Sequence, residues 1–417
     1  MIMSKKILAL LLSACIFMTG CGSDVTFTKR KNPTEIELSW WGNDARTEYT
    51  IEGARKFEEL HPDIEVKVSY SEWSGYEARN RIRMVSGTEA DVMQVNYSWL
   101  KEYSPDGKGF YNILDQKRQV NLSNFSQPML EYGIINGSLN AVPIAMNAET
   151  IYINKTIFDK YNLDIPETWD DYKNAAKVMS KDGIYPIAGV GKSVWLFAIA
   201  YAEQKTGKQI LNDDGTLNFT ASDLKIMLDF YSEMVECKVF PAIEKFDRLN
   251  VDNESYAGAI AWVRDAINYF GPLIEKGEEI VAAPYPHDDS HKSGDGWYAK
   301  PASLYAMSKD TDHPEEAAML LDFLVNSEEM ALLQGVEKGV PLSTKARDTL
   351  DKNDMLKGLQ YDASLVMENN ENLSKMNAYI EDSGMIDIFV AECDNVIFKK
   401  LTSQEAAAEL YAELTAE

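Results

Sequence analysis

Strand and helix patterns alternate without a break over residues 34–95, and this alternation constrains the fold more than any other feature. Residues 34–41 alternate apolar and polar side chains, which is the period of a strand with one buried face. Gly42 and Asn43 interrupt the pattern, and apolar side chains at helical spacing continue to about Leu60. A second strand, a second helix and a short apolar strand follow. Strands joined by helices form right-handed βαβ units, so the sequence predicts an α/β fold with a largely parallel sheet.

The carboxyl end of the first predicted strand carries Trp40, Trp41, Asp44 and Arg46. Ligands of open α/β sheets bind at the carboxyl ends of the strands. Aromatic rings offer flat apolar area and charged groups offer directional hydrogen bonds, so these side chains together suit a hydroxyl-rich ring. The alternative is a strand end with one core tryptophan and a surface ion pair, in which Asp44 caps the next helix.

The later part of the chain continues with short strands between helices. One strand is predicted at 139–154 with a kink near Pro143, and shorter strands are predicted at 185–190, 257–263, 280–284 and 303–307. Helical spacing occurs at 155–161, 171–179, 195–205, 223–235, 314–324 and 328–334, and the remainder is mostly helical apart from a loop at 381–384. The length of 417 residues suits about two domains.

The charge of the chain is strongly acidic. There are 41 basic and 66 acidic residues, which gives a net charge of −25. This balance argues against binding of nucleic acid, whose phosphates need basic patches, and against wide contact with an anionic membrane surface.

The amino terminus predicts export. Lys5 and Lys6 precede an apolar run at 7–17, and small residues lead to Cys21. This block resembles a bacterial lipoprotein signal, which implies that residues 1–20 are removed, that Cys21 carries the lipid, and that residues 21–33 form a tether. The implied location is the outer face of the cell membrane, or the periplasmic side where an outer membrane exists. The alternative is plain secretion with cleavage nearby.

Five sequence blocks follow one another along the chain: Trp40-Trp-Gly-Asn-Asp-Ala-Arg46, Glu89 to Trp99, Val142 to Trp169, Gly258-Ala-Ile-Ala-Trp262, and Tyr305 to Leu342. Their order and spacing resemble family 1 of the extracellular solute-binding proteins of bacterial ABC importers, the group that includes maltose-binding protein. The resemblance implies a two-lobed periplasmic-binding-protein-like fold. Its hinge would be crossed near 143–147, 300–303 and 339–343, which gives an N-terminal lobe of 34–145 with 303–341 and a C-terminal lobe of 146–302 with 342–417.

The resemblance also implies a ligand site in the cleft between the lobes, where a carbohydrate would hold them closed. The polar candidates are Asp44, Arg46, Asn96, Asn147, Arg264 and Asp265. The aromatic candidates are Trp41, Trp73, Tyr76, Trp99, Trp195, Trp297 and Tyr298. In the alternative, rings such as Trp195 pack in the cores, and the charged side chains form helix caps or surface ion pairs.

Two other functions fit parts of the sequence. A secreted glycan-active hydrolase would use paired carboxylates, and 66 acidic residues make chance pairs easy. The segment His287-Asp-Asp-Ser-His291 offers cation ligands, but it has the composition of a polar loop. No nucleophile elbow or metal motif is present, and Ala188 to Ser193 lacks the spacing of a phosphate-binding loop.

We therefore predict a binding protein without catalysis, cofactor or metal. Its expected partners are a carbohydrate and the membrane permease subunits of an importer. No nucleic acid is expected to bind, and membrane contact is expected only through the lipid. It is expected to be a monomer. Cys237 and Cys393 remain after the signal, and they either pair or stay as free thiols.

Overall fold

The structure is a computed structural model that describes residues 32–246, 255–288, 296–370 and 373–416. The predicted signal peptide, Cys21 and nearly all of the predicted tether lie outside these residues. Within the described ranges, no helix combines the length and the apolar character needed to cross a membrane.

The first βαβ units form as the sequence predicts. The chain makes, in order, β1 (Thr34–Trp41), α1 (Asp44–Leu60), β2 (Ile64–Ser71), α2 (Trp73–Ser86), β3 (Val92–Val95) and α3 (Tyr97–Tyr103). Strand β1 pairs in parallel with β2 along its whole length and with β3 at Leu38 and Ser39. The apolar side chains Ile36, Leu38 and Trp40 are buried, which is the one-sided burial that their spacing predicts.

The residue that caps α1 is Asn43 and not Asp44. The Asn43 side-chain oxygen accepts a hydrogen bond of 2.9 Å from the backbone N–H of Arg46. Asp44 is the first residue of α1 and is exposed, where its negative charge interacts favourably with the helix dipole.

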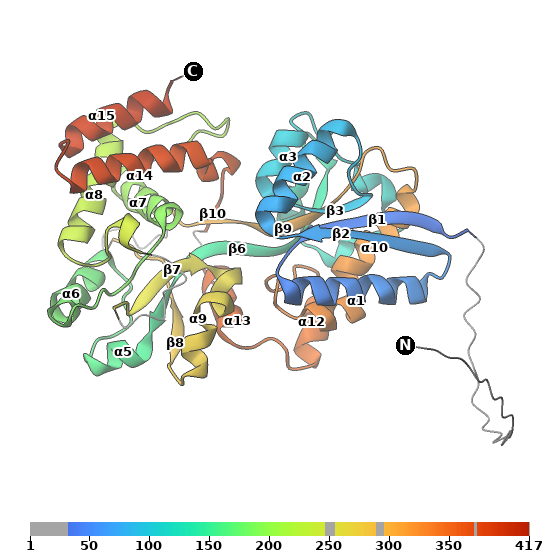
Figure 1. Cartoon of the computed structure of the whole chain (residues 1–417), viewed down its shortest axis with the longest axis horizontal. Helices are drawn as coiled ribbons and strands as arrows, with labels where there is room; N and C mark the ends of the chain where they lie inside the picture. Colours follow the sequence, from blue (N-terminus) through green and yellow to red (C-terminus); the bar gives the residue numbers. More distant parts are fainter. Residues whose placement is uncertain (1–31, 247–254, 289–295, 371–372, 417) are drawn as a thin grey trace, which may run out of the picture.

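The main sheet has eight strands in the order β2-β1-β3-β9-β6-β7, with β10 (Ser374–Lys375) beside β9 and β8 (Ile280–Ala283) beside β6. Strand β9 (Tyr298–Met307) is antiparallel to β3 and to the first half of β6 (Ala141–Asn154). The second half of β6 lies between β7 (Gly258–Trp262) and β8. Figure 1 shows that β6 and β9 run from one half of the molecule into the other.

The pairing of β6 with β9 is irregular at one place. The register shifts between Pro143 and Ala145 and again between Ala145 and Met146. Proline has no N–H to donate to the ladder, so the predicted kink near Pro143 is confirmed. At the same place Ala145 bridges Pro341, and the Leu342 N–H donates to the Ile144 carbonyl over 3.1 Å. Three segments of the chain therefore meet at the hinge.

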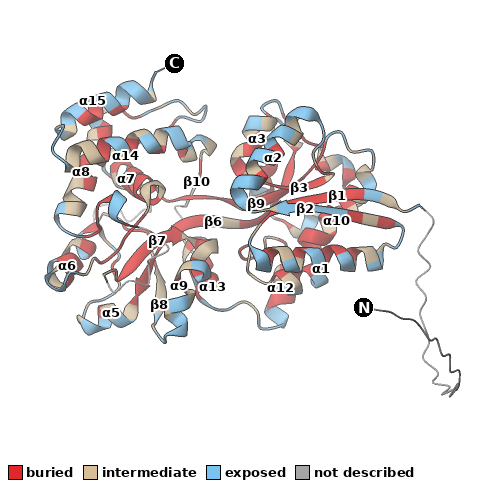
Figure 2. Cartoon of the chain, in the orientation of Figure 1, coloured by how far each residue is buried: buried red, intermediate tan, exposed pale blue. Residues whose placement is uncertain are grey.

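Each side of this hinge has its own hydrophobic core. Figure 2 shows buried residues along the central strands and exposed residues on the outer faces of the helices. The N-terminal lobe adds α4 (Gln127–Leu130), β4 (Ile134–Ile135), β5 (Ser138–Leu139), α10 (Pro314–Asn326), α11 (Glu328–Gln334) and α12 (Thr344–Lys352). The C-terminal lobe adds α5 (Lys155–Lys160), α6 (Trp169–Met179), α7 (Gly191–Thr206), α8 (Ala221–Glu236), α9 (Ala266–Glu275), α13 (Leu359–Glu368), α14 (Ser383–Ile397) and α15 (Ser403–Leu414).

The third crossing lies later than the sequence predicted. Helix α12 packs on α10 and α11, because Ala346 and Leu350 form an apolar cluster with Ala331. Helix α13 instead packs on β8 and α9 in the other lobe. The segment near 339–343 contacts the hinge, and the chain then returns to the N-terminal lobe. It crosses into the C-terminal lobe between Lys352 and Leu359 (Figure 1).

Two further expectations can be compared with the structure. The predicted strand at 185–190 is reduced to an isolated bridge between Tyr185 and Tyr256, and Pro186 cannot donate to a longer ladder. Cys237 is exposed and Cys393 is buried, and both are free thiols.

Gly339 provides a test of how tightly the hinge is packed. Its φ of +102° is unfavourable for other residues, and a Cβ atom there would lie 2.6 Å from the Ala145 Cβ. Gly277 has a similar φ of +89° but nothing within 4 Å of the added atom. We expect Gly339→Ala to lower the free energy of unfolding by roughly 1–3 kcal/mol more than Gly277→Ala, measured by denaturant titration. Equal losses would show that the hinge has room for the methyl group.

Candidate ligand-binding cleft

A pocket of about 420 Å³ lies between the lobes, at the carboxyl ends of β1 and β7 and directly after β3. The N-terminal lobe contributes Trp41, Gly42, Asn43, Arg46, Glu72, Trp73 and Asn96. The C-terminal side contributes Asn147, Lys192, Trp262, Arg264, Asp265, Asn268, Tyr269, Lys300, Ala302 and Glu381. Seven of the predicted site residues are therefore brought together here: Trp41, Arg46, Trp73, Asn96, Asn147, Arg264 and Asp265.

Aromatic rings form two layers on the N-terminal side. Trp41 and Trp73 line the pocket and meet edge to face, with ring centroids 5.0 Å apart. Behind them, the Trp99 ring is stacked on Trp73 at 5.6 Å and on Tyr76 at 6.1 Å. Trp99 and Tyr76 are buried and do not line the pocket, so their predicted place in direct contact with a ligand is corrected to a supporting layer.

The supporting layer is fixed by hydrogen bonds. The Tyr76 hydroxyl donates to the Gln94 carbonyl over 2.8 Å and lies 3.1 Å from the Ser39 hydroxyl. Burial raises the pKa of Tyr76 above its usual range, so the phenol stays neutral. The rings in front rest on a rigid base, which reduces the rotamer freedom that a ligand must restrict.

Arg46 connects the lobes. Its Nε donates to the Glu337 carboxylate over 3.0 Å, and its Nη2 donates to the Glu337 carbonyl over 3.3 Å. The same Nη2 lies 4.0 Å from a carboxylate oxygen of Asp265 in the C-terminal lobe. Asp44 is exposed two residues earlier and does not line the pocket, which corrects its predicted role in direct binding.

Asn147 and Arg264 form the wall next to the hinge. The Asn147 side-chain oxygen accepts a hydrogen bond of 3.1 Å from the Arg264 N–H. The Arg264 guanidinium donates to the Ala302 carbonyl over 2.9 Å and to Asp265 over 3.4 Å. These bonds hold the turn at the end of β7 against both hinge strands.

A cluster of two lysines and one glutamate was not predicted. Lys192 lies 2.9 Å from one Glu381 carboxylate oxygen, and Lys300 bonds to the other. Burial raises the pKa of Glu381, but the charges and hydrogen bonds of Lys300 and Lys192 outweigh this effect and lower the pKa to about 2. The sequence places these residues at a helix start, in a hinge strand and in a late loop, so no local pattern joins them.

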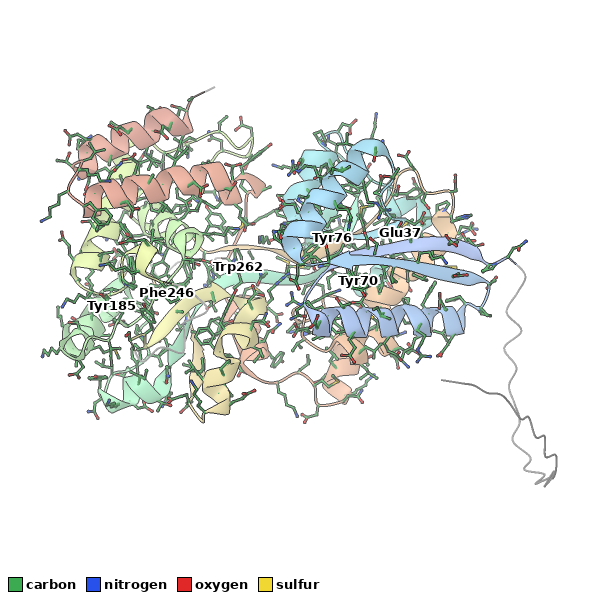
Figure 3. All side chains as sticks on the ribbon, in the orientation of Figure 1. Glu37, Tyr70, Tyr76, Tyr185, Phe246 and Trp262 are labelled. Atoms are coloured by element: carbon green, nitrogen blue, oxygen red, sulfur yellow. The ribbon has the colours of Figure 1, made fainter. Side chains whose placement is uncertain are left out.

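Trp262 and Tyr269 were also missed as site residues. Trp262 ends β7, and Lys300 Nζ lies 4.6 Å from its ring centroid in a cation–π contact. Figure 3 shows Trp262 on the side of the C-terminal lobe that meets the N-terminal lobe. Its position at the end of the predicted strand 257–263 was a usable signal, because Trp41 was identified on the same ground.

Three predicted aromatic residues lie in the core of the C-terminal lobe, and their predicted role as stacking platforms is corrected. Trp195 is fully buried, and its Nε1 donates to the Ile380 carbonyl. Trp297 is buried and stacks on Tyr285 at 5.5 Å. Tyr298 is buried with its hydroxyl donating to Glu203. A large ring whose polar atom makes a hydrogen bond is well suited to a core position. Residue type alone therefore does not distinguish a ring that packs in the core from one that stacks on a ligand.

A second pocket of about 180 Å³ adjoins the cleft and shares Lys192, Trp262 and Tyr269 with it. Its walls are mostly apolar, and Glu149 is its buried acid. Ser193 donates to one Glu149 oxygen over 2.7 Å, and the other oxygen has no hydrogen-bond partner among the described residues. Burial raises the pKa of Glu149 to about 7 in spite of the Ser193 hydrogen bond and the Lys192 charge.

The described residues contain no group of three or more His, Cys, Asp or Glu side chains placed to hold a metal ion. The second half of the segment 287–291 lies outside the described ranges. Helix α7 begins at Gly191, so the stretch 188–193 is a loop followed by the first residues of this helix.

Comparison with known proteins agrees with the geometry. A family model described as bacterial extracellular solute-binding protein matches residues 41–331. A periplasmic oligogalacturonide binding protein from Yersinia enterocolitica, solved with saturated digalacturonic acid, is similar with a TM-score of 0.83 and 30% identity, covering 91% of this chain and 97% of that one.

Two other similarities are informative. An uncharacterised ABC transporter extracellular-binding protein from Pyrococcus horikoshii is 23% identical over 98% of this chain and 96% of its own length. A de novo designed cysteine esterase is similar with a TM-score of 0.82 and 28% identity, covering 92% of this chain and 98% of that one.

The two-lobed α/β fold, the cleft between the lobes and the family match over residues 41–331 lead to one conclusion: the chain belongs to the bacterial extracellular solute-binding proteins, the binding components of ABC transporters.

Proposed function

We propose that this protein captures a carbohydrate, most simply an oligosaccharide, in the cleft between its lobes and delivers it to the membrane permease of an importer without altering it chemically. The observation that carries this proposal is the lining of the cleft. Aromatic rings face it from both lobes, Trp41 and Trp73 on one side and Trp262 and Tyr269 on the other. Between them lie planar polar groups, including Asn96, Asn147 and Arg264.

This lining matches the chemistry of sugars. A pyranose ring has C–H faces that pack on aromatic rings, and its hydroxyls bond best to planar amides, carboxylates and guanidinium groups. A volume of about 420 Å³ is sufficient for more than one sugar ring. The Yersinia protein with its bound disaccharide supports the same class of ligand for this chain.

Delivery follows from a ligand that contacts both lobes. Such a ligand stabilises the closed arrangement more than the open one, so binding shifts the population of the hinge. The register shifts near Pro143 interrupt the pairing of β6, which makes this the place where β6 bends most easily, and Arg46 bridges the lobes between Glu337 and Asp265. We propose that the permease recognises the closed form and that the protein works as a monomer.

A hydrolase is the second candidate, because designed esterases share this fold. A glycosidase needs one protonated and one ionised carboxyl group on opposite sides of the bond that it cleaves. Glu381 is held ionised by two lysines, and its pKa of about 2 makes it a poor proton donor. Arg264 and Arg46 both approach Asp265, which places that carboxylate in an ion-pair network. Glu149, whose pKa burial raises to about 7, lines the adjoining pocket and not the cleft, so the cleft favours binding over hydrolysis.

We expect the full chain to bind members of a panel of neutral and acidic di- and trisaccharides without releasing new reducing ends. Binding is measured by calorimetry and by a rise in melting temperature, since a ligand that binds only the folded state stabilises it. Hydrolysis of a bound sugar would contradict the carrier function and indicate a hydrolase.

Trp73→Ala tests the role of the aromatic wall. Trp73 is 37% exposed, so its removal leaves the core intact, and we expect affinity for the tightest-binding sugar of the panel to fall about tenfold or more. Tyr70→Ala is the matched control, because Tyr70 is 44% exposed and stacks on Trp40 without lining the cleft. If both variants and the wild type bind the sugar with equal affinity, the aromatic wall does not contribute to the site.

We also propose that Cys21 anchors the protein to the membrane through a lipid, because the amino-terminal block has the order of a lipoprotein signal. In a bacterial host fed radioactive palmitate, the wild-type chain should carry the label and sediment with membranes. Cys21→Ser should lose both properties. Retention of Cys21→Ser in the membrane fraction without the label would indicate an uncleaved signal in place of a lipid.

A further inference from the structure

The cleft is rich in positive charge although the whole chain carries −25. Four cationic side chains line it: Arg46, Lys192, Arg264 and Lys300. The carboxylates that line it are Glu72, Asp265 and Glu381. In so acidic a protein, this concentration of basic groups in one pocket calls for a physical explanation.

The ion pairs do not neutralise these cations evenly. Arg46 pairs with Glu337, and Arg264 pairs with Asp265, so each guanidinium has a carboxylate of its own. Lys192 and Lys300 share the single carboxylate of Glu381. This cluster, Lys192–Glu381–Lys300, therefore has two ammonium groups for one carboxylate in its ion pairs, and the nearby Glu149 carboxyl, whose pKa burial raises to about 7, offsets the second ammonium only in part.

The cluster is also partly removed from water. The side chains of Lys300 and Glu381 are 11% exposed, and that of Lys192 is 39% exposed. A charge that is compensated only in part at a partly dry site is costly, and a ligand anion that enters the cleft would offset that cost. Lys192 is the accessible member, so its ammonium group is available to an incoming ligand.

Two neighbouring lysines respond to the same positive potential. Burial lowers the pKa of Lys338, the charges of Arg46 and Arg264 add to this effect and Glu337 opposes it, so that the pKa is about 7. Burial also lowers the pKa of Lys300; Glu381 offsets part of this effect, while Lys192 and Arg264 add to it. Both observations agree with a region that favours an added negative charge.

We propose that the carbohydrate is acidic, a uronate-containing oligosaccharide whose carboxylate binds the Lys192–Glu381–Lys300 cluster while its rings stack on the aromatic walls. This inference rests on the proposed function and specifies its ligand class. One carboxylate group of the ligand would give the second ammonium of the cluster a partner of its own. A phosphate carries close to two charges at neutral pH and would be repelled by the Glu381 carboxylate beside it.

The competing explanation is structural. The cluster joins α7, the turn at Ala378–Glu381 and β9 within one lobe, so it would also serve as a clamp. The two roles have different consequences. A clamp affects stability and the binding of every sugar alike, whereas an anion site affects only acidic ligands.

The test compares digalacturonate with digalactose of the same linkage, which differ in having a carboxylate in place of the hydroxymethyl group on each of the two rings. Affinities of the full chain are measured by calorimetry at low and high salt. We expect digalacturonate to bind at least about tenfold more tightly at low salt, and the advantage to shrink as salt screens the charges. Galactose 1-phosphate is included as an anion of a different kind and is expected to bind more weakly than galacturonate.

Lys192→Gln should reduce the affinity for digalacturonate about tenfold and that for digalactose by a much smaller factor. Lys192→Arg should restore the preference for the acidic sugar. Lys205→Gln is the matched control: Lys205 lies on the same helix, is also 39% exposed and pairs with Asp288, but does not line the cleft.

The outcomes separate the two proposals. Equal binding of both disaccharides, or equal weakening of both by Lys192→Gln, would overturn the acidic ligand and leave the carbohydrate function standing. Tighter binding of galactose 1-phosphate than of galacturonate would overturn the carboxylate assignment. Binding of no member of the neutral and acidic panel would overturn the carbohydrate function itself, and the acidic ligand with it.

Discussion

The antiparallel pairing of β6 with β9 is the constraint on which the rest of the structure depends. These two strands pass through both lobes, and the other strands of the main sheet attach to one end or the other of the pair. The lobes therefore share a sheet while each keeps a core of its own. Continuous backbone hydrogen bonds resist bending, so the register shift beside Pro143 determines where the sheet can flex.

The position of the cleft follows from the same arrangement. Strands β1, β3 and β7 end on the side where the lobes meet, and the residues at those ends line the pocket. Side chains at strand ends are free of the sheet, while the strands hold their backbones in place. The second layer of Trp99 and Tyr76 extends this rigidity to the rings in front of it. A site built in this way combines fixed walls with the hinge strands between them, which is the arrangement that the proposed closure on a ligand requires.

The features that could be predicted from the sequence are those that depend on residues close together in the chain. Alternation over 34–95 was sufficient for the βαβ units, and the strand-end rule placed Trp41, Arg46 and Asn96 at the pocket. The sequence did not identify Lys192, Lys300 and Glu381, because three distant segments bring them together. It also assigned Trp195, Trp297 and Tyr298 to the site, since ring type and chain position do not reveal whether a face remains exposed. The late third crossing was missed because it depends on how Ala346 and Leu350 pack on another helix.

Neither lobe is continuous in the chain, and this has a consequence for biosynthesis. Val92 in β3 finds its partner Met307 in β9 only after most of the C-terminal lobe has been translated. The C-terminal lobe in turn lacks α13, α14 and α15 until the last part of the chain emerges from the ribosome. Both cores therefore remain incomplete through most of translation, and folding that depends on such distant contacts is slow. Because the two cores are completed late, the polypeptide stays unfolded through most of its synthesis. An unfolded chain is the form that can pass through an export channel.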